Sequence, residues 1–97
     1  MFRQFYKGLS ESEIKKHIET EGFSPMKIRN DPDYVYEEHS HPETKLLAFL
    51  EGSMEVTVDG EHYSCVKGDK MIIEGNVSHS AVVGNEGCTF FWSEKLT

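Results

Sequence analysis

The sequence lacks the features that mark secreted and membrane-spanning proteins. It has only two cysteines, too few for a disulfide scaffold. It also has no run of about 18 apolar residues, the length that a membrane helix needs. The first residues show neither the apolar stretch nor the cleavage site of a signal peptide. We therefore expect a cytoplasmic protein without a membrane partner, in which Cys65 and Cys88 are reduced thiols.

Positive charge is also scarce. Ten Lys and Arg residues stand against 17 Asp and Glu residues, which gives a formal net charge of −7 at pH 7. No stretch is rich in basic residues, so we expect no nucleic acid partner. Nucleophile elbows, phosphate-binding glycine loops and paired-carboxylate motifs are absent as well. The chemistry of the chain then depends on its histidines.

The length and composition fit a single domain over residues 1–97. A chain of 97 residues is too short for two packed cores, while a hydrophobic fraction of 37% is enough for one. One helix is well signalled over about residues 11–21. Ser10 can cap it, Glu13 completes a capping box, and Gly22 suits the left-handed residue that ends a helix. The apolar stripe of this helix is thin, so we expect it to lie on the surface of a larger structure.

After the helix, the pattern changes to short β segments separated by turns. Asp59-Gly60 is a two-residue hairpin signal, which would pair Met54 with Cys65. No second helix is signalled, so the sequence predicts an all-β antiparallel sandwich or barrel over about residues 26–94. The expected strands are 26–29, 34–41, 45–51, 54–58, 61–66, 70–74, 77–83 and 88–94.

Two of these predicted strands, 45–51 and 88–94, are apolar on both faces. One face can line the inside of a barrel, but the other must be covered by something else. The helix can cover part of it. A second subunit is the natural candidate for the rest, so we expect a homodimer.

Two histidines one residue apart suggest a binding site. On a strand, His39 and His41 would project to the same side and could approach one metal ion at about 2.0–2.1 Å. A mononuclear site needs at least one further ligand. Because this spacing often arises by chance, the surrounding residues have to support the interpretation.

The surrounding residues resemble the cupin superfamily. HSHP at 39–42 leads to Gly52 at the spacing of the first cupin motif. KGDKMIIEGNVSHSA at 67–81 is similar to the second motif, with His79 in the position of the third ligand. The resemblance implies a double-stranded β-helix, the cupin jelly-roll barrel, which here follows one short N-terminal α-helix. It also implies a dimer whose barrel mouth holds a divalent transition metal (Fe, Zn, Ni or Mn).

The sequence departs from the family at the glutamate of the first motif, where it has Lys45. An ammonium group pointing inward beside three imidazoles repels a cation and cannot act as a ligand while it is protonated. Glu43 has the parity of His39 and could replace the missing carboxylate, although Pro42 disturbs that alternation. Alternatively, the ion keeps only its three histidines. Lys45 could then bind a substrate carboxylate or phosphate, or act as a base.

The main hypothesis is a metal-binding cupin with the ligands His39, His41 and His79, which binds or acts on a small, anionic metabolite. As an enzyme it would be a dioxygenase, an isomerase or a decarboxylase, and the fold does not choose among these. The alternative is a metal-free ligand-binding or sensor module in which Lys45 replaces the metal-ligand glutamate. A third hypothesis is a structural dimer whose barrel has lost its site.

Overall fold

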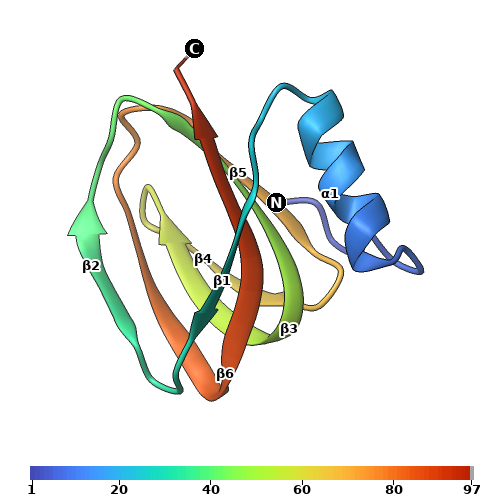
Figure 1. Ribbon diagram of the computed structural model, residues 1–97. Coiled ribbons are helices and arrows are strands. Elements are labelled where there is room, and N and C mark those ends of the chain that lie inside the picture. The colour runs from blue at the N-terminus through green and yellow to red at the C-terminus, as the bar shows by residue number, and fades with distance from the viewer. Residues whose placement is uncertain (97) are drawn as a thin grey trace.

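The computed structural model describes residues 1–96, which form one helix and six strands (Figure 1). All the strand pairs are antiparallel, so the prediction of an all-β fold with one N-terminal helix is confirmed. The elements are α1 (Glu11–Thr20), β1 (Met26–Asn30), β2 (Val35–His39), β3 (Thr44–Val58), β4 (Glu61–Val66), β5 (Lys70–Ile73) and β6 (His79–Lys95).

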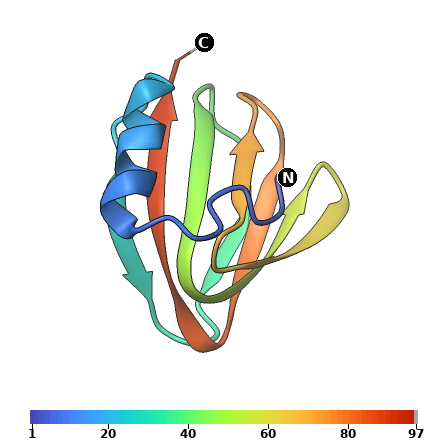
Figure 2. The ribbon, with the colours of Figure 1, turned by 90° about the vertical axis from the view of Figure 1, so that its right-hand side faces the viewer.

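Two long strands, β3 and β6, organise the sheet by pairing along almost their whole length. Their register shifts around Leu50 and Ser53, which divides each strand into two halves. The first half of β3 pairs with β5, and the second half of β6 pairs with β1. The second half of β3 pairs with β4, and the first half of β6 pairs with β2. The sheet therefore folds into two layers that face each other (Figures 1 and 2).

Gly52 lies at this bend and is the glycine of the first sequence motif. Its φ of +73° is in the left-handed region, which favours glycine. A Cβ atom at this position would also collide with the backbone of Gly87 on β6. The bend of β3 against β6 thus requires a residue without a side chain.

Apolar side chains form two separate cores on the two sides of one layer. Alternate residues of β3 point to opposite sides, so Leu47 lies inside the barrel while Leu46 lies outside it. The inner core consists of Leu47, Phe49, Met54, Val56, Cys65, Met71, Ile73, Val83, Cys88 and Phe90. The outer core consists of Tyr6, Ile14, Ile18, Phe23, Leu46, Ala48 and Phe91.

The outer core lies between the sheet and α1, together with the segment that precedes the helix (Figure 2). This cover leaves Leu46, Ala48 and Phe91 at most 3% exposed in the single chain. The apolar outer face, which suggested a second subunit, is therefore buried by the chain's own N-terminal region. The expected homodimer remains a prediction, without the support of this face.

The ends of α1 form as the sequence predicted, although the helix is one residue shorter. The Ser10 hydroxyl accepts a hydrogen bond from the Glu13 amide at 3.2 Å, and the Ser10 amide donates to the Glu13 carboxylate at 2.9 Å. Gly22 has a φ of +88°, and the Phe23 amide donates to the Ile18 carbonyl. Within residues 1–96, no helix combines the length and the apolar character required to cross a membrane.

The two cysteines are free thiols in the inner core. Burial raises the pKa of Cys65 to about 12 and that of Cys88 to about 11. Because the thiolate is the reactive form, neither side chain suits nucleophilic chemistry at neutral pH.

The predicted Asp59-Gly60 hairpin is confirmed, with positive φ at both turn residues and Met54 opposite Cys65. The predicted division of the other strands is wrong in two places. Segments 45–51 and 54–58 are parts of the single strand β3. Most of segment 77–83 and all of segment 88–94 belong to β6, which begins at His79. In both cases the glycine-containing stretch bends a continuous strand where the sequence suggested an interruption.

Truncation of Ile18 tests whether α1 is an integral part of the domain. Ile18 is fully buried in the outer core, so Ile18→Ala should lower the free energy of unfolding by about 2 to 5 kcal/mol. Chemical denaturation followed by circular dichroism measures this difference. The exposed Lys15 on the same helix provides the control, because Lys15→Ala should change stability very little. An unchanged midpoint for Ile18→Ala would show that α1 does not pack against the sheet.

Candidate metal centre

The three histidines come from two neighbouring regions at one end of the barrel. His39 is the last residue of β2, and His79 is the first residue of β6. The two are direct cross-strand partners. His41 lies in the loop after β2, where its carbonyl accepts a hydrogen bond from the Asn76 amide. The sequence placed His39 and His41 on one strand, but a loop rather than strand alternation brings His41 to the site.

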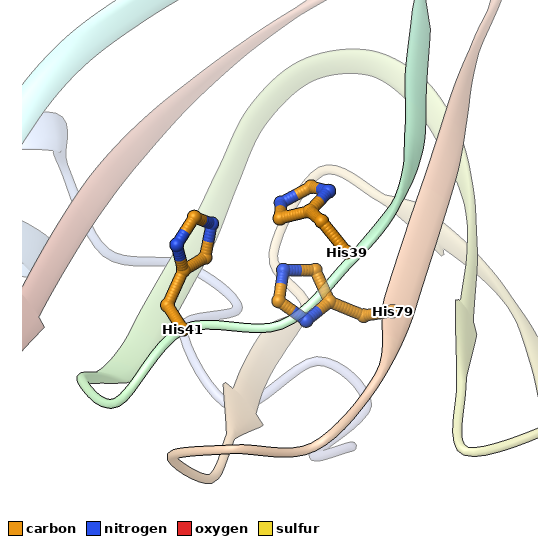
Figure 3. Close-up of side chains that lie close together, drawn as sticks. All are labelled: His39, His41 and His79. Carbon is orange, nitrogen blue, oxygen red and sulfur yellow. The ribbon is translucent and has the colours of Figure 1, made fainter.

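The three imidazole rings face a common space (Figure 3). One ring nitrogen of each of His39, His41 and His79 lies within 4.8 Å of the others. A tetrahedral ion with metal–nitrogen bonds of about 2.1 Å holds its ligands about 3.4 Å apart, so the ring nitrogens would have to approach one another by at most about 1.4 Å. Small rotations of the side chains supply such a movement. The sequence prediction that these three histidines lie together is confirmed at the level of their positions.

Backbone carbonyls orient two of the rings. Nδ1 of His79 donates to the Val77 carbonyl at 3.0 Å, and Nδ1 of His39 donates to the Glu37 carbonyl. Because a carbonyl oxygen can only accept, each Nδ1 carries the proton and the lone pair is on Nε2. Histidines that bind metals typically show this arrangement, which fixes both the tautomer and the direction of the ring.

The environment keeps His79 in the neutral form that a metal requires. Burial lowers its pKa, and the nearby charges of His39, His41 and Lys45 lower it further. The hydrogen bond to the Val77 carbonyl acts in the opposite direction and is outweighed. At neutral pH the His79 imidazole is therefore available as a ligand without first losing a proton.

A cavity of about 450 Å³ extends from the histidines into the barrel. Its wall is largely apolar, and its polar groups include the three histidines, a combination that is common in small-molecule sites. The apolar wall consists of Ile28, Leu47, Met54, Val56, Ile73, Ala81, Phe90 and Trp92. The polar residues are Tyr36, His39, His41, Glu43, Lys45, His79, Ser80 and Glu94.

Lys45 lines this cavity but already has a partner. Its ammonium group lies 2.5 Å from a carboxylate oxygen of Glu94 and 4.8 Å from the centre of the Trp92 ring. Lys45 and Glu94 are cross-strand partners on β3 and β6. Glu94 was not among the residues predicted from the sequence. Only the register between the two strands could have identified it, and no local pattern reveals that register.

Glu43 lies on the wall of the same cavity, partly exposed. Among the described residues, the group of ligand atoms that lie within 4.8 Å of one another consists of His39, His41 and His79. The carboxylate of Glu43 does not belong to this group. The role of Glu43 as a replacement metal ligand thus remains a prediction.

Protonation of His79 should destabilise the metal-free protein. Its folded-state pKa lies below the ordinary value of 6.5, so the unfolded chain binds more protons between these two values. The resulting stability is complete above the ordinary value and is lost as the pH falls through the lowered, folded-state pKa. The melting temperature of the metal-free protein should therefore fall more steeply between about pH 7.5 and pH 5 than that of His79→Gln.

His62 provides the control for this measurement, because it is an exposed histidine of β4 that does not line the cavity and pairs with Glu55 at 2.9 Å. The melting temperature of His62→Gln should fall with pH as steeply as that of the original protein. If the melting temperatures of the original protein and of His79→Gln fell equally steeply with pH, the argument would be wrong.

Comparison with known proteins identifies the family and shows the same fold in solved structures. Residues 26–94 match the family described as the AraC-like ligand binding domain. No curated protein matches the chain. Among solved structures, a conserved Streptococcus pyogenes protein of unknown function is 20% identical with a TM-score of 0.69, and the match covers 77% of this chain and 65% of that one.

Two further structures show the same fold. An RmlC-like cupin from Shewanella frigidimarina is 24% identical with a TM-score of 0.70, and the match covers 77% of this chain and 67% of that one. Oxalate decarboxylase from Bacillus subtilis, which has Mn(II) centres, is 23% identical with a TM-score of 0.66. That match covers 75% of this chain but only 21% of the decarboxylase. The chain thus spans about two thirds or less of these relatives, and the likeness concerns the fold alone. On the strength of the family match, this chain belongs to the family of AraC-like ligand binding domains, and it has the cupin fold.

Proposed function

We propose that this protein binds a small molecule in its barrel cavity beside a divalent transition metal held by His39, His41 and His79. The observation that carries the proposal is the convergence of three imidazoles, one nitrogen of each lying within 4.8 Å of the others. The backbone carbonyls that orient His39 and His79 support it, because they leave Nε2 free. When bound, the metal would supply open coordination positions and Lewis acidity for a ligand or a water molecule.

The donor set favours particular metals. Imidazole suits Zn, Cu, Ni and Fe, whereas Mn and Mg prefer carboxylate and other oxygen ligands. The converging group contains three nitrogen donors and no carboxylate. Of the ions that the sequence suggested, we therefore propose Zn, Ni or Fe ahead of Mn.

The cavity supports ligand binding as the central activity. Its volume of about 450 Å³ and its apolar wall can enclose a small organic molecule, while the polar residues beside the histidines can orient its polar end. The match to AraC-like ligand binding domains also supports binding rather than a particular reaction. If catalysis occurs, Lys45 is the side chain that we propose to contact the substrate, since it lines the cavity and carries a positive charge.

A second candidate function is that of a metal-free sensor for a small anion. The ammonium group of Lys45, on a side chain that is only 7% exposed, favours this alternative. A ligand carboxylate could take the place of Glu94 beside that ammonium group and extend its apolar part into the cavity.

Metal content separates the two candidates. The purified protein should take up one equivalent of Zn²⁺ per chain, as measured by elemental analysis and calorimetric titration. His79→Ala should weaken the affinity on the order of 100-fold or more, because it removes one of only three ligands. His62→Ala removes an exposed histidine outside the cavity and should bind Zn²⁺ like the original protein.

The same titration checks the choice of metal. Zn²⁺ should displace Mn²⁺, and Mn²⁺ alone should bind only weakly. A protein that takes up neither Zn²⁺, Ni²⁺ nor Fe²⁺ at micromolar concentrations would contradict the metal-binding proposal and leave the sensor function.

A further inference from the structure

The proposed metal centre contains a positive charge that ought to oppose it. Lys45 occupies the position where the first cupin motif has its glutamate, and its side chain lines the same cavity as the three histidines. Only 7% of that side chain is exposed, so bulk water screens its charge poorly. An unpaired ammonium group in this place would repel a divalent cation.

Glu94 changes this electrostatic situation. Its carboxylate oxygen lies 2.5 Å from the ammonium nitrogen of Lys45, so the two opposite charges are in direct contact as a charge-assisted pair. The contact follows from the fold, because the two residues are direct cross-strand partners on β3 and β6. To an ion at the histidines, a close pair of opposite charges acts as a dipole of no net charge, whose repulsion falls off faster with distance than that of a free ammonium group.

The pair also restrains the position of the lysine. The ammonium group lies 4.8 Å from the centre of the Trp92 ring, which belongs to the same strand as Glu94. A cation is attracted to the face of an aromatic ring, so Trp92 and Glu94 together hold Lys45 towards β6. Without the carboxylate, the flexible side chain would be free to turn to other parts of the cavity.

We propose that Glu94 is the residue that makes Lys45 compatible with a metal ion at His39, His41 and His79. It neutralises the ammonium group and holds it against β6. Glu94 is thus a positioning residue for the centre, and it acts through Lys45 without being a ligand. This inference depends on the proposed metal-binding function and explains how the centre can dispense with the glutamate of the family.

The experiment is a double-mutant cycle on Zn²⁺ affinity, measured by competition with a chromophoric chelator. Glu94→Gln removes the negative charge while retaining the shape of the side chain, and it should weaken Zn²⁺ binding about 10-fold to 100-fold. Lys45→Met removes the positive charge and should bind Zn²⁺ at least as tightly as the original protein. In the Lys45→Met background, Glu94→Gln should weaken Zn²⁺ binding much less than it does in the original protein, because no ammonium group remains to be neutralised.

A second ion pair provides a closely matched control. Lys70 pairs with Glu21 at 2.8 Å, and the two side chains are 7% and 37% exposed, compared with 7% and 34% for Lys45 and Glu94. Neither Lys70 nor Glu21 lines the cavity of the histidines. Glu21→Gln makes the same change in net charge and also leaves a buried lysine unpaired. It should retain the Zn²⁺ affinity of the original protein, with circular dichroism confirming that each variant is folded.

The outcomes distinguish this inference from the function on which it depends. Unchanged Zn²⁺ affinity in Glu94→Gln would overturn it, as would an equal loss in the presence and absence of Lys45. Zn²⁺ binding by Lys45→Met but not by the original protein would also overturn it, while retaining the histidines as a metal site. If neither protein binds Zn²⁺, the proposed function itself fails, and the role of Glu94 fails with it.

Discussion

The antiparallel pairing of β3 with β6 is the constraint on which the rest of the structure depends. These two strands contribute to both layers of the sheet, so their common bend creates the barrel. Their register also positions the site. It sets His79 opposite Val58 at one end of the pairing and Lys45 opposite Glu94 at the other. A register shift of one residue would turn every side chain of one strand to the other face. It would separate His79 from the other histidines and Lys45 from Glu94.

Within this framework, the candidate metal centre depends on both long-range and local effects. The pairing of β2 with β6 brings His39 beside His79. The direction of each of these two rings is then set locally, because its Nδ1 donates to a carbonyl two residues earlier in the chain. The fold therefore brings these histidines together, and short stretches of backbone set the orientation of His39 and His79.

This division explains which features could be predicted from the sequence. The capping of α1 by Ser10 and the Asp59-Gly60 hairpin are encoded within a few residues, and both were predicted correctly. The three histidines were found because they fall within two recognisable motifs. The pairing of Lys45 with Glu94 spans 49 positions in the chain, and no short segment contains the register that produces it. The continuity of β3 through Gly52 escaped prediction because a bend and a turn both call for glycine.

The two buried lysines show how this fold accommodates charge and why one pair matters to the site. Each pairs with a glutamate and lies near an aromatic ring: Lys70 is 4.2 Å from the centre of Phe5, and Lys45 is 4.8 Å from that of Trp92. The Lys70–Glu21 pair connects β5 to the end of α1, so it has a structural role in fastening the helix.

The Lys45–Glu94 pair joins two strands that the backbone already pairs over many residues. Buried ion pairs often stabilise a protein no better than apolar residues of the same size, because removing two charges from water is costly. The alignment of β3 and β6 therefore does not depend on this pair, because the backbone already sets it. The position of this pair in the wall of the cavity instead fits the role that we propose, in which Glu94 neutralises Lys45 beside the three histidines.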